Sequence, residues 1–162
     1  MGLSVHVVGG GGPSMYDGAE MRMTSCKDPP DAEVRKDVAG GGAGDAEKKG
    51  AAAGRSAREN EAFDFVKELA TYRRDHKTLH SGKLMQYLPQ DGLYVYFRYD
   101  ATGTVMVASN TTDKPASLPT ARFSERMDGF SKARNVLTGE SLSSVASPQL
   151  PAKTAVVPGL LK

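Results

Sequence analysis

Two acidic side chains near the start of the chain have a spacing that suggests hydrolytic chemistry. Asp17 and Glu20 lie in a segment that glycine and proline interrupt repeatedly. A carboxylate pair can supply the acid and the base of a hydrolysis when an apolar environment raises the pKa of one member. The flanking sequence predicts no apolar pocket at this position, so we expect both carboxylates to be solvated and non-catalytic.

Histidine, cysteine and glycine clusters suggest other chemistries. His76 and His80 have a spacing that lets two histidines on one helix share a metal ion, but Lys77–Leu79 supplies no third ligand. The single cysteine, Cys26, excludes an internal disulfide and has no histidine near it. The run Gly9–Gly12 lacks the pattern of a phosphate-binding loop. We therefore predict no metal site and no cofactor.

Tyrosines could bind sugar rings by stacking. Tyr94 and Tyr96 share one face of a predicted strand, and Tyr87 and Tyr99 are close to them in the sequence. Aromatic side chains at strand spacing belong more often to a core or to an interdomain contact than to a sugar platform. The sequence leaves both interpretations open, and Tyr94 with Tyr96 is the better candidate pair for a sugar site.

A predicted β-hairpin over residues 93–109 positions these tyrosines. It consists of two runs separated by the turn-forming segment Asp100–Gly103, and within each run successive side chains point to opposite faces. Val95 and Phe97 fall on one face and Tyr96 on the other, and both faces are fairly apolar. A strand that is apolar on both faces is usually covered on both, so we expect this hairpin to lie inside a larger assembly.

The rest of the chain predicts a mainly β protein, an antiparallel β-sandwich preceded by one long helix. The helix begins with the capping box Ser56–Glu59 and ends near Asp75. Prolines 115, 119, 148 and 151 would protect edge strands. Further strands are predicted at Gly82–Leu88, Ala116–Leu118, Asn135–Gly139 and Lys153–Val157.

The first third is rich in glycine and is expected to be largely irregular. Met1–Val8 contains a short strand-like run, SVHVV. Residues 24–53 are predicted to be loop, either an active-site loop outside its usual setting or a flexible linker.

Composition excludes some classes of partner. Twenty-one basic and 19 acidic residues give a net charge of +2, which offers no electrostatic argument for nucleic acid or for an anionic membrane. No run approaches the ~20 apolar residues that cross a bilayer, and the start does not resemble a secretory signal. The default expectation is a cytoplasmic location.

Three stretches resemble the sequence of a known family, and the third is the specific one in order and spacing. Residues 11–20 read GGPSMYDGAE, similar to G-I-P-x-x-Y-Y-G-x-E, and residues 34–41 read VRKDVAGG, similar to I-R-x-D-F-P-G-G. The third is EAFDFVKEL at 61–69, continued by YRR, LHSGKLM and YVYFRY at 72–74, 79–85 and 94–99. Together they resemble the C-terminal end of the α-amylase family of glycoside hydrolases, nearest to its neopullulanase and cyclomaltodextrinase-like members.

The resemblance assigns expected roles to these stretches. The first would be the last barrel strand with its following loop, and the second the active-site loop, where Arg35 would lie near the substrate. The third would be the last barrel helix leading into the β-sandwich domain C. The positions that match the first motif are Gly11, Pro13, Tyr16, Gly18 and Glu20.

Several residues depart from the family pattern. Asp17 replaces the second tyrosine of the first motif, Gly12 replaces its isoleucine, and Val38 and Ala39 replace the Phe-Pro pair of the second motif. The family's nucleophilic Asp, acid/base Glu and stabilising Asp precede all three stretches, and none has a counterpart here. A retaining mechanism needs two carboxyl groups about 5 Å apart, so no catalytic residue is predicted in this chain.

The resemblance also implies a domain organisation and a function. Residues 1–54 would be the barrel-strand and loop remnant, 55–76 the last barrel helix, and 77–162 a domain C-like sandwich. The chain would be the C-terminal portion of an enzyme acting on α-glucans, with domain C bracing the barrel and no catalysis by the chain alone. The alternatives are a stand-alone α-glucan-binding module and a partner of a separately encoded barrel.

Overall fold

The computed structural model describes residues 2–24, 37–40, 42–142 and 144–162 of the chain. It contains two compact units. The first, here the β unit, comprises Met1–Pro13 with Glu68–Lys162, and the second, here the loop unit, comprises Ser14–Lys67. Helix α2 (Ala57–Asp75) contributes residues to both units.

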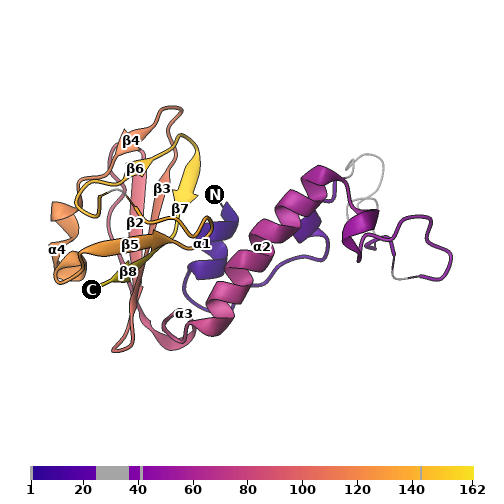
Figure 1. The fold of residues 1–162 in the computed structure, drawn as a ribbon, viewed down its shortest axis with the longest axis horizontal. Helices are drawn as coiled ribbons and strands as arrows, with labels where there is room; N and C mark the ends of the chain where they lie inside the picture. Colours follow the sequence, from indigo (N-terminus) through magenta and orange to yellow (C-terminus); the bar gives the residue numbers. More distant parts are fainter. Residues whose placement is uncertain (1, 25–36, 41, 143) are drawn as a thin grey trace. The chain divides into compact units, whose positions relative to one another are not determined.

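An antiparallel sheet of six strands forms the framework of the β unit, in the order β1-β2-β3-β8-β5, with β7 pairing to β3. A second sheet pairs the short strands β4 and β6, which lie together at one end of the unit (Figure 1). This arrangement confirms the predicted antiparallel β-sandwich. The strands are β1 Lys83–Gln86, β2 Leu93–Tyr99, β3 Thr104–Asn110, β4 Ala116–Ser117, β5 Lys132–Asn135, β6 Gln149–Leu150, β7 Thr154–Val156 and β8 Pro158–Leu161.

The predicted hairpin is confirmed as β2 and β3, with Phe97 opposite Met106 and Tyr96 opposite Val107. Asp100 closes its turn: one oxygen of its carboxylate accepts hydrogen bonds from the backbone N–H of Thr102 (2.7 Å) and that of Gly103 (3.1 Å). The Thr102 hydroxyl also donates to this oxygen (2.6 Å) and is the largest cause that lowers the pKa of the Asp100 carboxyl, followed by the backbone N–H of Thr102.

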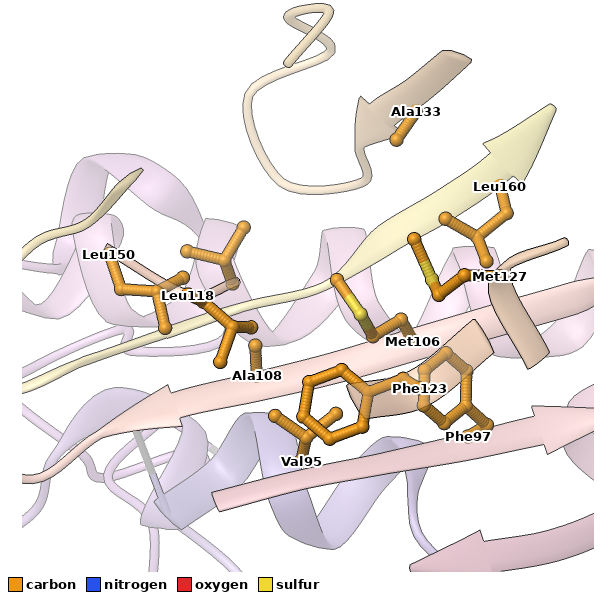
Figure 2. Packing of buried hydrophobic residues seen from close by; sticks show 11 residues of the cluster. Val95, Phe97, Met106, Ala108, Leu118, Phe123, Met127, Ala133, Leu150 and Leu160 are labelled. Carbon is orange, nitrogen blue, oxygen red and sulfur yellow. The ribbon is translucent and has the colours of Figure 1, made fainter. Parts of the chain in front are cut away.

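One face of the hairpin forms the hydrophobic core. Figure 2 shows Val95 and Phe97 of β2 next to Phe123, with Met106 and Ala108 of β3 beside them. Phe123 ends the 3-10 helix η4 (Thr120–Phe123), which leads into α4 (Ser124–Met127). The remaining members of the buried cluster are Leu118, Met127, Ala133, Leu150, Val156 and Leu160.

The other face of the hairpin is also covered, which confirms the prediction made from its two apolar faces. Helix α1 (Gly2–Val8) contacts β3 and β7, and α3 (Thr78–Ser81) contacts β2 and β3. Tyr96, Val105 and Val107 are buried on this face.

Helix α1 corrects the strand-like interpretation of residues 4–8. Ser4, Val7 and Val8 are all buried, and their spacing of three and four residues places them on one face of a helix. A run of five residues is too short for its periodicity to distinguish strand from helix, so the contact with β3 and β7 decides the outcome.

The strand predicted at Asn135–Gly139 is also corrected, because β5 ends where that strand was expected to begin. The Asn135 side chain accepts a hydrogen bond from the N–H of Leu137 (3.0 Å), and Gly139 donates to the Asn135 carbonyl (2.8 Å). Gly139 has a φ of 71°, which glycine adopts without strain. Asn135 therefore starts a turn, as asparagine often does.

The loop unit contains short 3-10 helices, η1 (Ala19–Met21) and η3 (Ala52–Gly54), and the first part of α2. The predicted capping box of α2 is confirmed: Ser56 donates its N–H to the Glu59 carboxylate (2.6 Å), and Glu59 donates its N–H to the Ser56 hydroxyl (3.3 Å). Lys49 adds an ion pair to the same carboxylate at 2.9 Å.

Helix α2 should lose stability in acid through Glu59. The Ser56 backbone N–H, Lys49 and the Ser56 hydroxyl lower the pKa of Glu59 to about 2. Because the unfolded chain binds this proton at about pH 4.5, the stabilisation is complete above that pH and decreases as the pH falls towards 2. Circular dichroism of the wild type and Glu59→Gln from pH 6 to 2 measures the effect. The wild type should melt at a higher temperature than Glu59→Gln at pH 6, and this difference should become smaller as the pH falls to 2. A difference that stays constant would show that the ionised Glu59 carboxylate does not stabilise the helix.

Candidate functional site

The family-motif residues lie in both units, so each group is described separately. Gly11 and Pro13 are exposed residues of the β unit. In the loop unit, the Tyr16 side chain is 62% exposed, and Gly18 has a φ of 84°. A Cβ at position 18 would collide with the Met23 side chain, so this turn requires glycine.

The two carboxylates of the predicted pair differ in exposure. Asp17 is exposed and Glu20 is half-buried within η1. Arg35, the residue that the resemblance places near substrate, lies outside the described residues, as does Cys26.

Backbone carbonyls contact both histidines. His76 Nδ1 lies 2.7 Å from the Tyr72 carbonyl, and His80 Nε2 lies 2.7 Å from the Arg73 carbonyl. The His76 ring stacks on Tyr72, with centroids 3.7 Å apart. Among the residues that the structure describes, no three His, Cys, Asp or Glu side chains are grouped as metal ligands would be.

Tyr94 and Tyr96 lie on the same face of β2, with ring centroids 5.8 Å apart, but their exposure differs. Tyr96 is 2% exposed, and burial strongly raises the pKa of its phenol. Tyr94 is half-buried and donates its hydroxyl to Gln86 at 3.0 Å. Both line a depression of about 300 Å³ beside Gly9 and Gly10. Only Tyr94 presents an accessible ring to a ligand.

A buried arginine of β2 is the functional residue that sequence analysis missed. Arg98 is 2% exposed, and it donates to the Gly9 carbonyl at 2.6 Å and to the Gly82 carbonyl at 2.9 Å. Burial lowers the pKa of its guanidinium, and the positive charge of Arg73 adds to the shift. The available signal was a single cation in a run of otherwise apolar and aromatic residues, LYVYFRY.

Arg73, at the end of α2, binds the same segment. It donates to the Val7 carbonyl at 3.0 Å and to the Gly11 carbonyl at 2.9 Å. Arg73 and Arg98, here the arginine clamp, therefore bind the carbonyls of residues 7, 9 and 11. The clamp ties residues 7–11, which include the first residue of the first family motif, to α2 and to β2.

A comparison with known protein families identifies most of the β unit. Residues 84–158 match the family model of the cyclo-malto-dextrinase C-terminal domain. This range runs from the second residue of β1 to the first residue of β8, so it contains the hairpin, Arg98 and every member of the core cluster except Leu160. The β unit therefore contains the region that matches the cyclo-malto-dextrinase C-terminal domain.

Solved α-amylases share the fold of the chain. The α-amylase of Anoxybacillus, described as representing a new glycosyl hydrolase subclass, is 22% identical, with a TM-score of 0.68 over 98% of this chain and 31% of its own. The α-amylase of Geobacillus thermoleovorans in complex with acarbose is 17% identical, with a TM-score of 0.72 over 99% and 32%. AmyP in complex with maltose is 14% identical, with a TM-score of 0.76 over 97% and 33%.

Residues 84–158 thus match the cyclo-malto-dextrinase C-terminal domain, and the chain shares its fold with part of these solved enzymes. It spans about a third of the length of the solved structures that it matches. In the described part of the chain, no helix has both the length and the apolar character needed to cross a membrane.

Proposed function

We propose that the chain supplies the last barrel strand and helix, together with domain C, of a hydrolase acting on α-glucans such as starch, pullulan, maltodextrin or cyclodextrin. Residues 1–54 would be the strand and active-site loop, 55–76 the last barrel helix, and 77–162 domain C. In this proposal domain C braces the barrel, and the catalytic carboxylates come from a barrel that this sequence does not contain.

The observation that carries the proposal is the arginine clamp. Arg73 lies on the proposed barrel helix and Arg98 on the proposed domain C, and both bind carbonyls of the segment that leads into the GGPSMYDGAE motif. Hydrogen bonds from charged donors are among the stronger ones in proteins. A domain that holds the approach to the last barrel strand in this way can brace a barrel.

The proposal predicts no turnover by the purified chain. Incubation with starch, pullulan, maltoheptaose or β-cyclodextrin should release no reducing sugar above a blank, because both members of the nearest carboxylate pair are in a glycine-rich turn. Glu20→Gln serves as the matched variant. Turnover by the wild type that Glu20→Gln abolishes would contradict the proposal.

A second measurement tests the bracing role. If a barrel is encoded separately, the chain should co-purify with that barrel fragment and restore its hydrolysis. If it is encoded in the same frame, the DNA upstream of Met1 should specify the three catalytic carboxylates. If no separate barrel fragment co-purifies and the upstream DNA encodes no barrel, the chain has no barrel to brace and the proposal is overturned.

The second candidate function is α-glucan binding by the chain itself. The depression beside Tyr94 favours it, since a half-exposed ring next to Gly9 and Gly10 leaves room for a sugar. Tyr96 would support Tyr94 from beneath instead of stacking on the sugar. Arg35 stays a candidate sugar contact on the grounds of the resemblance alone.

A further inference from the structure

A second depression of the β unit, separate from the one beside Tyr94, has the composition of a ligand site. Its volume is about 400 Å³, within the range of about 300–1000 Å³ typical of small-molecule sites. The start of β2, the segment that precedes it and the stretch from β4 to η4 enclose it. No family motif of the chain includes its polar residues.

The floor of this depression is apolar and rigid. Val95, Leu118 and Phe123 are buried members of the hydrophobic core and also line the depression. Tyr87 forms an aromatic wall, packed edge-to-face against Phe123 with centroids 4.7 Å apart. Burial, the largest cause, raises the pKa of the Tyr87 phenol. A flat apolar ligand face would be buried here against side chains that are already ordered.

The rim carries one cation and one anion. Arg122 donates to the Gln90 side chain at 2.9 Å and to the Leu88 carbonyl at 3.0 Å, which fixes its guanidinium and leaves further N–H donors for a ligand. Arg122 forms no ion pair with any residue in the described ranges. Asp91, on the same rim, likewise has no ion pair among those residues.

A tight turn fixes the position of Asp91. Gln90 and Leu93 exchange two backbone hydrogen bonds, of 3.0 and 2.8 Å, across Asp91 and Gly92. Asp91 has a φ of 51° and Gly92 a φ of 75°, which are the left-handed angles of a two-residue hairpin turn. The turn therefore fixes the backbone from which the exposed Asp91 side chain extends.

We propose that this depression is a non-catalytic binding site for one glucosyl unit of an α-glucan, with the sugar ring on the apolar floor and its hydroxyls on Arg122 and Asp91. The charges select a neutral ligand, because Asp91 repels an anion and Arg122 repels a cation. Sugar hydroxyls can hydrogen-bond to both side chains, because a hydroxyl can donate to the Asp91 carboxylate and can accept from the Arg122 guanidinium. The choice of glucosyl among neutral polyols rests on the proposed function.

Titration of the whole chain with maltotriose tests the site. In two-dimensional NMR spectra, the signals of Tyr87, Leu93 and Phe123 should shift on titration. Arg122→Ala should weaken binding about tenfold, as expected for losing hydrogen bonds from a charged group. Asp91→Asn should weaken it severalfold while keeping the turn, because asparagine tolerates a positive φ. Arg74→Ala, an exposed arginine paired with Asp75, is the control and should leave binding unchanged.

Three outcomes would overturn the site. The first is shifts that gather at Tyr94 and Leu84 and disappear in Tyr94→Ala, since sugar would then bind at the other depression. The second is a hexuronate that binds more tightly than maltotriose, because the ligand would then be an anion. The third is no shift with maltotriose or β-cyclodextrin at millimolar concentration. None of these affects the proposed bracing function, which depends on the barrel experiments and requires no sugar on domain C.

Discussion

Replacing Phe97 with alanine should lower the free energy of unfolding of the β unit by about 3–5 kcal/mol. The side chain is 0% exposed and lies at the centre of the core cluster, with ring contacts to Tyr87 and Phe123 at centroid distances of 6.0 and 6.1 Å. Truncation removes the transfer free energy of the ring and leaves a cavity that strands β2 and β3 cannot close. Urea denaturation followed by circular dichroism measures the loss as a lower midpoint.

The control for this experiment is Leu88→Ala. Leu88 is 83% exposed, so its truncation should change the free energy of unfolding by less than about 0.5 kcal/mol. The slope of the denaturation curve should stay the same in both variants if the same surface is exposed on unfolding. A loss below about 1 kcal/mol for Phe97→Ala would show that the cluster is not the core of the β unit.

Replacing Arg98 with alanine should destabilise the β unit by about 3 kcal/mol, since a buried acceptor left without a donor costs roughly 1–3 kcal/mol. Three carbonyls lose a donor, the partly buried ones of Gly9 and Gly82 and, at 3.5 Å, that of Thr78. Because Gly9 directly follows α1, the loss of its hydrogen bond should also destabilise α1 locally, in addition to lowering the stability of the whole β unit. Hydrogen exchange should show faster exchange of the α1 amides and of the glycine run than of β3.

Two further variants separate the causes of this effect. Arg98→Met keeps most of the side-chain length but removes the donors, so any loss common to Met and Ala comes from the hydrogen bonds. Arg74→Ala removes an exposed arginine of α2 whose pair with Asp75 is at the surface, and it should have little effect. If Arg98→Met is as stable as the wild type, the arginine clamp adds no net stability and the bracing argument loses its main support.

Local sequence patterns predicted the elements whose contacts are local. The hairpin of β2 and β3 depends on alternation and on Asp100, whose side chain closes the turn. The start of α2 depends on Ser56 and Glu59, whose reciprocal hydrogen bonds join residues three apart. The turn at Asn135 was missed because a short apolar run outweighed the tendency of asparagine to start turns.

Sequence alone predicted the resemblance to the C-terminal end of the α-amylase family, and residues 84–158 match the cyclo-malto-dextrinase C-terminal domain. It also determined the sandwich, since period-two alternation decides which side chains are buried. The tertiary structure decided that α1 is a helix, that Tyr96 is buried and that Arg98 binds Gly9. It also brought Asp91 and Arg122 to one rim. These features depend on contacts between residues far apart in the sequence, whose free energies no local pattern contains.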